Sequence, residues 1–237
     1  MADKTTPERR LKNQAILSVK PNGGDTNYEL ELRSANCSVC DMQDKFAPAI
    51  WQFDKVVLTA EKVLRAAKIL NIPVYVTTQN AARLGGTVAA LEALLAATGA
   101  TTIDKTRFSM WVPELARHFA STAGSAAAGV PESPAQCRVV IVGIESHICV
   151  TQTALDLLAT GHDVFVLADG VSSCNEQEVP LALARLRAEG ATVVSSESWL
   201  YETMGDAGIA EFREIAKLVK ETSADTKTAL SALLSKM

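Results

Sequence analysis

Short apolar runs alternate with longer segments of helical period along most of this chain, and this alternation limits the possible folds more than any other feature. The runs expected to be strands are residues 37–42, 73–77, 101–103, 138–142, 163–167 and 191–194. The segments expected to be helices are residues 53–70, 88–97, 112–119, 149–160, 179–188 and 210–221. Strands that alternate with helices form a parallel sheet covered on both faces. The pattern therefore predicts an α/β fold: a three-layer α/β/α sandwich around a doubly wound, six-stranded, mainly parallel sheet.

The alternation divides the chain into three parts. Residues 1–26 are expected to form a polar N-terminal arm, residues 27–221 the folded domain, and residues 222–237 a tail helix that packs on a partner or frays. Residues 28–34 alternate apolar and polar side chains, which predicts an edge strand. The segment 121–136, rich in small residues and proline, is interpreted as a surface loop because the alternation resumes after it.

Composition narrows the possible partners and the compartment. The 237 residues carry a net charge of −4 with no basic patch, and aromatic residues make up 5%, which argues against nucleic acid and anionic membranes as partners. No apolar run approaches the length of a membrane span. The odd count of five cysteines is unlike a secreted disulfide framework. We expect a reducing compartment, the cytoplasm rather than the mitochondrion.

Three chemically capable residues follow predicted strands. In open α/β sheets, ligands bind at the carboxyl ends of the strands near the switch in strand order. Asp41 closes the first strand, Lys105 follows the third, and Cys149 stands at the start of the helix after the fourth. A thiol at a helix N-terminus has a stabilised thiolate, a carboxylate can accept its proton, and an ammonium offsets their charges. Each residue also has a simpler interpretation: Asp41 as a turn or cap, Lys105 as a surface lysine and Cys149 as a small core residue.

Four sequence motifs together resemble the isochorismatase-like cysteine hydrolase superfamily, and within it the isochorismatase domain-containing proteins. They are CDMQDKF, KTRFSM, GIESHICV and TALDLLATGHDVFVLADGVSS, and they occur in the family's order between about residues 37 and 220. The resemblance implies the sandwich fold predicted above, with strand order 3-2-1-4-5-6. It implies a catalytic triad of Asp41, Lys105 and Cys149.

The resemblance implies further features of the site. The Ile144–Glu145 peptide bond is expected to be cis, and the backbone N–H groups of Glu145 and Cys149 to form an oxyanion hole. With the implied strand order, the third strand lies two strands from the first, about 10 Å away. Lys105 must then be carried inward by its loop.

Four residues near the predicted triad are candidates for the substrate pocket. Phe46, Phe108 and Trp111 each lie just beyond a triad residue, and Gln79 follows the second strand, where its side chain can donate a hydrogen bond to a substrate. Simple packing is the alternative for the aromatic residues.

Other motifs were weighed and set aside. Cys37 and Cys40 have CxxC spacing, but within a strand this spacing places the two thiols on opposite faces. His147 lies two residues before Cys149 and suggests a Cys–His dyad, whereas the family uses an aspartate as the base. Metal-dependent nicotinamidases of the superfamily carry histidines after the second strand, and TTQNAARLGG holds none. No phosphate-binding or dinucleotide-binding glycine motif is present, so no metal and no cofactor are expected.

The sequence thus predicts a hydrolase that cleaves a C–N bond of a small molecule through a thioester on Cys149. Two alternatives stay open: hydrolysis of the vinyl ether of isochorismate, which needs no such cysteine in the superfamily, and a non-catalytic scaffold that retains the fold. The family resemblance also implies a homo-oligomer, a dimer or a tetramer. The sequence does not identify the substrate.

Overall fold

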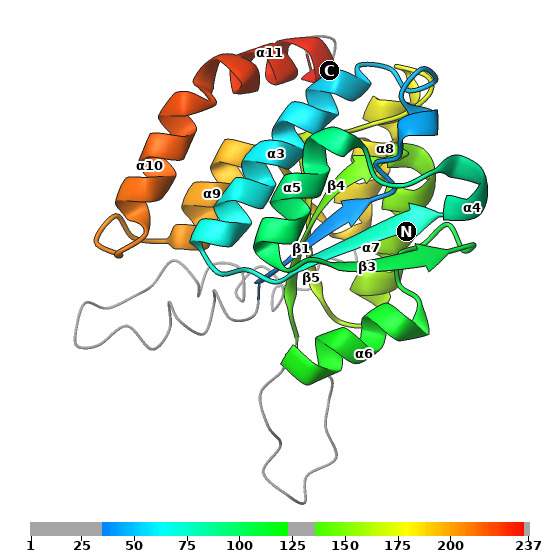
Figure 1. The fold of residues 1–237 in the computed structure, drawn as a ribbon, viewed down its shortest axis with the longest axis horizontal. Coiled ribbons are helices and arrows are strands. Elements are labelled where there is room, and N and C mark those ends of the chain that lie inside the picture. Colours follow the sequence, from blue (N-terminus) through cyan, green and yellow to red (C-terminus); the bar gives the residue numbers. More distant parts are fainter. Residues whose placement is uncertain (1–34, 123–135, 235–237) are drawn as a thin grey trace, which may run out of the picture.

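The computed structural model describes residues 35–122 and 136–234, and its centre is a six-stranded parallel sheet (Figure 1). The strands are β1 (Ala35–Cys40), β2 (Val74–Gln79), β3 (Thr101–Lys105), β4 (Arg138–Ile144), β5 (Asp163–Ser172) and β6 (Thr192–Val194). Their order is β3-β2-β1-β4-β5-β6, and all neighbours pair in parallel. The predicted fold class and strand order are confirmed, and the switch in strand order falls between β1 and β4.

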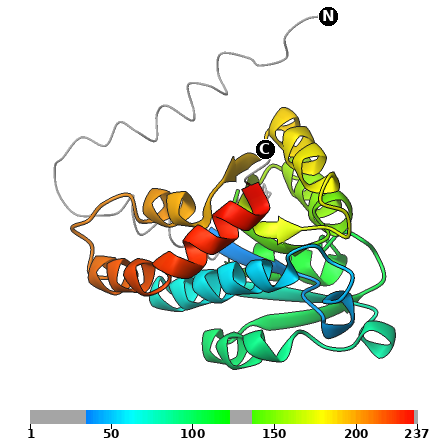
Figure 2. The same ribbon diagram turned by 90° about the horizontal axis from the view of Figure 1, so that it is seen from above.

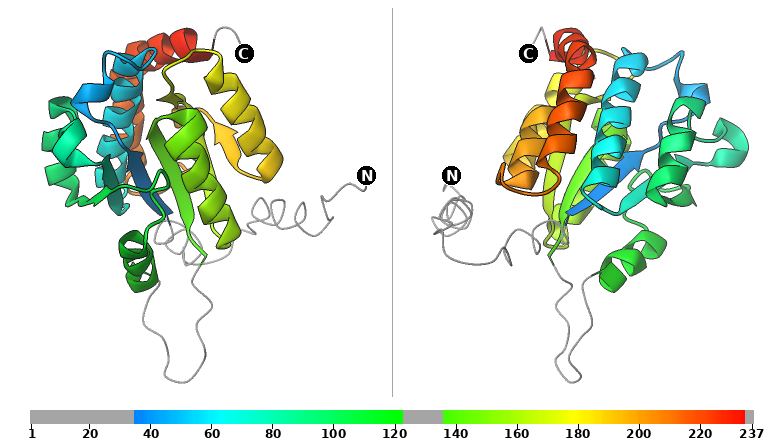
Figure 3. Two further views of the ribbon diagram at one scale, coloured as in Figure 1. Left: turned by 90° about the vertical axis from the view of Figure 1, so that its right-hand side faces the viewer. Right: turned by 60° about the vertical axis from the view of Figure 1, so that its left-hand side comes forward.

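Helices cover both faces of the sheet. One layer consists of α3 (Phe53–Ile69), α5 (Ala89–Thr98), α9 (Ser196–Met204), α10 (Phe212–Glu221) and α11 (Ser223–Leu234). The other consists of α6 (Pro113–Thr122), α7 (Thr151–Ala159) and α8 (Glu178–Glu189). A short helix α4 (Ala81–Leu84), a 3₁₀ turn (Asp44–Phe46) and a π-helical turn (Ser146–Val150) lie in connections. The two layers are seen on either side of the sheet in Figures 2 and 3.

β1 shows how the strand alternation builds two cores. Cys37 and Val39 pack with α3 in one apolar cluster, while Cys40 belongs to the cluster that holds α7 and α8. Both faces of this central strand are buried, and the burial includes the polar residues Asn36 and Ser38. The prediction that the Cys37 and Cys40 thiols point to opposite faces is confirmed.

Two elements differ from the sequence prediction at the C-terminal side of the sheet. β5 extends to Ser172, five residues beyond the predicted end, and every residue from Val164 to Ser172 is buried. Helix α9 was not predicted. It begins after Ser195, whose side chain accepts a hydrogen bond from the Ser198 N–H, and Asp169 accepts hydrogen bonds from the N–H and hydroxyl of Ser196.

The last helix packs on its own chain. The predicted tail helix was expected to lie on a partner or to fray, but α11 covers α3 and β5 and buries Thr226, Ala229 and Leu233. Figure 1 shows α11 crossing over one end of α3. Lys62 of α3 strengthens this contact, since its Nζ lies 3.1 Å from Thr226 Oγ1. The tail-helix prediction was thus right about the helix and wrong about its packing.

Some predictions fall outside the described residues. The polar arm at 1–26, the edge strand at 28–34 and most of the loop at 121–136 lie there. Within the described residues, no helix is long and apolar enough to cross a membrane.

Candidate active site

Asp41 lies directly after β1, at the switch in strand order. Its φ of 50° turns the chain out of the sheet, a conformation that aspartate tolerates better than most residues. Oδ1 accepts a hydrogen bond from Thr77 Oγ1 at 2.7 Å, and the backbone N–H donates to the Thr77 carbonyl. These contacts fix the carboxylate in a buried position, where a charge needs partners.

Lys105 supplies the opposite charge. Its Nζ lies 2.7 Å from Asp41 Oδ2, and both side chains are 1% exposed. Nζ also donates to Gln79 Oε1 at 2.8 Å and to the carbonyls of Arg107 and Phe108 at 3.1 Å. The N–H groups of the ammonium therefore all have acceptors within the protein, which a buried ion pair requires.

The route by which Lys105 reaches Asp41 differs from the prediction. Lys105 is the last residue of β3 and pairs in register with Gln79 of β2. Its long side chain crosses β2 from within the strand, so the loop is not needed to carry the residue inward. The carbonyls of that loop instead accept hydrogen bonds from the ammonium.

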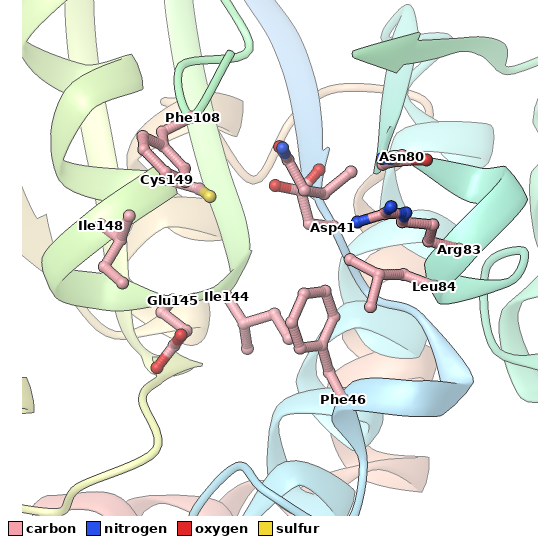
Figure 4. A pocket seen from close by; sticks show the side chains of 11 residues that line it. Asp41, Phe46, Asn80, Arg83, Leu84, Phe108, Ile144, Glu145, Ile148 and Cys149 are labelled. Atoms are coloured by element: carbon pink, nitrogen blue, oxygen red, sulfur yellow. The ribbon is translucent and has the colours of Figure 1, made fainter. Parts of the chain in front are cut away.

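Cys149 lies across the pocket from Asp41. It belongs to the π-helical turn Ser146–Val150, which continues directly into α7, so the helix begins three residues earlier than predicted. Cys149 is 8% exposed, and Figure 4 shows its sulfur pointing into the pocket. Thr153 links Cys149 to the loop that follows Lys105. Its hydroxyl donates a hydrogen bond to the Cys149 carbonyl and accepts one from the Met110 N–H of that loop.

The pocket has a volume of about 390 Å³, a size suited to a small molecule. Three of the four predicted lining residues are part of it: Phe46, Gln79 and Phe108. Trp111 is not, because its ring packs edge-on against the Phe119 and His162 rings. The lining residues that the sequence did not indicate are Asn80, Arg83, Leu84, Ile144 and Ile148.

The Gln79 side chain, predicted to donate a hydrogen bond to a substrate, already has partners within the protein at both of its polar atoms. Its Oε1 accepts from Lys105, and its Nε2 donates to the Thr106 carbonyl at 2.9 Å. Gln43, which sequence reasoning missed, holds this strand end in place: its Oε1 accepts from the Gln79 N–H, and its Nε2 donates to the Gly85 carbonyl. The glutamine of the DMQ motif is therefore a brace between β1 and the chain after β2.

Cys40 is a second thiol at the site. Its Sγ lies 3.7 Å from Asp41 Oδ2 and within hydrogen-bonding reach of Cys149. Burial raises the pKa of Cys40 well above its usual value, and contact with Cys149 and Asp41 raises it further. Cys40 therefore stays protonated beside the two groups, and it is more than the packing residue that the sequence indicated.

The chain before Cys149 contains the feature that the resemblance implied. The Ile144–Glu145 peptide bond is cis, and Glu145 lines the pocket. The Cys–His dyad that was set aside from the sequence gains no geometric support, because His147 Nδ1 lies 2.9 Å from Ser173 Oγ. Metal-dependent nicotinamidases bind their metal with histidines that follow the second strand. Here the end of β2 and the next residue are the amides Gln79 and Asn80, so the residues present do not fit a metal centre of that kind.

Fold and site together define a class: doubly wound α/β proteins in which a buried carboxylate–ammonium pair and a thiol meet at the switch in strand order. Comparison with known proteins places the chain within this class. The sequence model of the isochorismatase domain matches residues 37–198. The chain belongs to the isochorismatase family, whose members are hydrolases, and the resemblance inferred from the motifs is confirmed.

Individual relatives are similar over most of the chain. The secreted isochorismatase effector Isc1 of Phytophthora sojae is 41% identical over 184 residues, which cover 77% of this chain and 83% of that protein. Isochorismatase domain-containing protein 1 of Salmo salar is 38% identical over 199 residues, which cover 84% of this chain but 63% of that protein. The solved structure of MAR1 ribonuclease from Caenorhabditis elegans is 34% identical with a TM-score of 0.71, covering 79% of this chain and 90% of that one.

Proposed function

We propose that this protein is a cysteine hydrolase that cleaves the C–N bond of a small amide-type substrate through a thioester on Cys149. The observation that carries the proposal is the Asp41–Lys105 pair, 2.7 Å apart and buried, at the edge of the pocket that Cys149 enters. A protein has little structural reason to hold an acid, an ammonium and a thiol at the ends of three strands, because burying a charge is costly.

The reaction begins with transfer of the Cys149 proton to Asp41. The thiolate attacks the substrate carbonyl carbon, and the negative charge that develops on its oxygen is stabilised by the backbone N–H groups of Glu145 and Cys149. Asp41 then protonates the nitrogen as the C–N bond breaks, which releases the amine and leaves a thioester. Lys105 keeps Asp41 ionised at the start of the cycle and orients it.

The second half of the reaction uses the same carboxylate. After the amine leaves, Asp41 accepts a proton from a water molecule, which attacks the thioester carbon. The C–S bond breaks, the carboxylic acid product departs, and Cys149 recovers its proton. Because one aspartate serves both steps, the reaction depends on the position of its carboxylate, which Thr77 and Lys105 hold by hydrogen bonds.

A screen of small amides and ureides, with an RNA oligonucleotide and isochorismate as further arms, tests the proposal. We expect turnover of at least one amide or ureide, and Cys149→Ala should reduce it by about a thousandfold or more while the protein stays folded. An acyl adduct on Cys149, detected by intact-mass spectrometry, would identify the thioester. Undiminished turnover by Cys149→Ala contradicts the thioester route.

The second candidate function is hydrolysis of the vinyl ether of isochorismate. The observation in its favour is Arg83, whose guanidinium lines the pocket and is suited to binding a carboxylate such as those of isochorismate. The Cys149→Ala variant separates the two candidates, because vinyl ether cleavage does not require the thiol. Retained isochorismate cleavage in that variant, with no amide turnover in the parent, would favour this candidate.

A further inference from the structure

A second group of chemically capable side chains lies at the rim of the pocket. Glu145, His147 and Cys174 each offer one potential ligand atom, and these atoms all lie within 4.8 Å of one another. Glu145 and His147 come from the chain between β4 and α7, and Cys174 follows β5. The cluster brings together a carboxylate oxygen, an imidazole nitrogen and a thiol, and the proposed hydrolysis uses none of the three side chains.

The local structure holds the three residues in these positions. The Cys174 N–H donates to Glu145 Oε2 at 2.8 Å, which fixes the carboxylate against the chain after β5. His147 Nδ1 lies 2.9 Å from Ser173 Oγ, and Ser173 Oγ is also hydrogen-bonded to Ser146 Oγ. A ring nitrogen anchored in this way is typical of metal-binding histidines, whose second nitrogen is held by a neighbouring polar group.

The donor set selects among cations. Zn²⁺ is a borderline-soft ion that accepts sulfur, nitrogen and oxygen ligands in tetrahedral geometry, whereas Ca²⁺ and Mg²⁺ prefer oxygen. Ligand atoms around tetrahedral Zn²⁺ lie about 3.5 Å apart, so the atoms of this cluster, which are within 4.8 Å of one another, would have to move closer by at most about 1.3 Å. Cys174 is exposed, so the ion and a water ligand can enter from solvent.

We propose that Glu145, His147 and Cys174 bind one Zn²⁺ ion at the rim of the pocket, with water as the fourth ligand. On binding, the Cys174 thiol releases its proton to solvent and the thiolate bonds to the metal, while His147 binds as neutral imidazole. The ion cross-links the chain after β4 to the chain after β5, on the side of the pocket formed by Glu145. The inference does not depend on the hydrolysis proposed above, because it concerns side chains that take no part in it.

Metal binding by the full-length chain tests the proposal directly. The protein is treated with a chelator, dialysed, and titrated with ZnCl₂ in competition with a chromophoric chelator. CoCl₂ in a parallel titration gives a near-ultraviolet charge-transfer band when a thiolate binds the metal. We expect one metal ion per chain, a thiolate–Co²⁺ band, and a higher melting temperature of the parent in ZnCl₂.

Single variants show which thiol binds the metal. Cys174→Ser should lose the Co²⁺ band and weaken Zn²⁺ binding at least about tenfold, and His147→Ala should weaken it similarly. Cys149→Ser is the matched control and should keep both the band and the affinity, since it removes the thiol that lines the pocket and leaves the proposed metal ligands in place. Absence of metal uptake by the parent, or a band that depends on Cys149 and not on Cys174, overturns the proposal. Cys174→Ser is well suited to the test because serine nearly preserves the size of an exposed side chain.

Discussion

At the scale of single residues, close backbone contact shapes the site as much as the reactive groups do. Gly143 of β4 has φ 122°, and a Cβ atom there would lie 2.1 Å from the Cys40 carbonyl oxygen. Only glycine allows β4 to approach β1 so closely at the position directly before Asp41. The close approach of β1 and β4, the strands that lead to Asp41 and Cys149, therefore depends on a residue with no side chain.

Gly143→Ala should destabilise the protein by about 2–3 kcal/mol, because the added methyl group collides with backbone and the φ is unfavourable for alanine. Urea unfolding measures the change. Gly86→Ala is the matched control, since a Cβ at Gly86 meets nothing within 4 Å. Equal stability of the two variants would show that β4 can move away from β1 without cost.

Sequence reasoning indicated the three residues of the proposed triad but missed the residues that support them. Asp41, Lys105 and Cys149 stand out because their residue types are unusual at strand ends, and a family resemblance assigns them roles. Thr77, Gln43 and Cys40 are ordinary strand and turn residues, and their contacts with the site arise only from strand pairing. Arg83 was missed for a similar reason, since it lies on the short helix α4, which the alternation of apolar runs did not indicate.

At the scale of elements, a buried polar network joins four of them. Lys62 of α3 is 2% exposed, and its Nζ donates to Ser196 Oγ of α9 and Thr226 Oγ1 of α11. Asp169 of β5 accepts from Ser196, and its carbonyl accepts from the Thr59 hydroxyl. The network explains how helices α9 and α11, which lie far from α3 in sequence, are held beside α3 on the same face of the sheet.

The pH dependence of stability tests the role of Lys62. Burial lowers the pKa of Lys62 below its usual 10.5, against the opposing effects of Asp169 and Glu197. Between the lowered value and 10.5 the unfolded chain binds more protons than the folded one, so Lys62 makes the unfolding free energy rise with pH in this window. Lys62→Met should remove that contribution, measured by urea unfolding between pH 7 and 10.

Lys217→Met, at an exposed lysine of α10, is the control for this experiment. The control should follow the parent at every pH, because other titrating groups are the same in both proteins. A Lys62→Met curve parallel to that of the parent would contradict the shifted pKa.

Packing of α11 on its own chain gives a second prediction for the elements. Leu233 is 3% exposed and belongs to the core beside α3, so Leu233→Ala should cost about 2–5 kcal/mol of unfolding free energy. Leu181→Ala is the control, because Leu181 of α8 is 66% exposed and its truncation should change stability by less than about 0.5 kcal/mol. Similar losses at the two positions would argue against α11 as part of the core.

The order of strands and helices could be predicted because short apolar runs mark most of the strands and the main helices keep their period. Helix α9 and the long β5 could not. Residues 168–172 contain an aspartate and two small polar or glycine positions, which indicate a loop, yet they are buried because Asp169 is satisfied by Ser196. The tail was misjudged because α11 is only weakly amphipathic, and nothing in the sequence says which surface covers it.

At the scale of the whole molecule, the described residues form one sheet between two helical layers, with the proposed active site at the carboxyl ends of the strands. The family resemblance predicts that such chains assemble. Size-exclusion chromatography with light scattering should give a dimer or a tetramer of the 25.2 kDa chain at micromolar concentration. A mass equal to one chain under these conditions would contradict this prediction.

The five thiols differ in their exposure to solvent, so an alkylating reagent should label them to different extents. Cys37, Cys40 and Cys137 are buried, and burial raises the pKa of Cys37 to about 12 and that of Cys137 above its usual value. Cys174 is exposed, but contact with Glu145 raises its pKa. We expect an alkylating reagent to reach Cys174, which is exposed, and Cys149, which is buried but lines the pocket.

The rate of Cys149 alkylation by iodoacetamide at pH 7 tests the central claim most directly. Peptide mass spectrometry follows Cys149 and Cys174 in the parent and in Asp41→Asn, with Cys174 as the internal control. With Asp41 as the base, Cys149 should react more than about tenfold faster than Cys174 in the parent, and Asp41→Asn should abolish that advantage while Cys174 keeps its rate. Alkylation of Cys149 in Asp41→Asn as fast as in the parent would contradict the account.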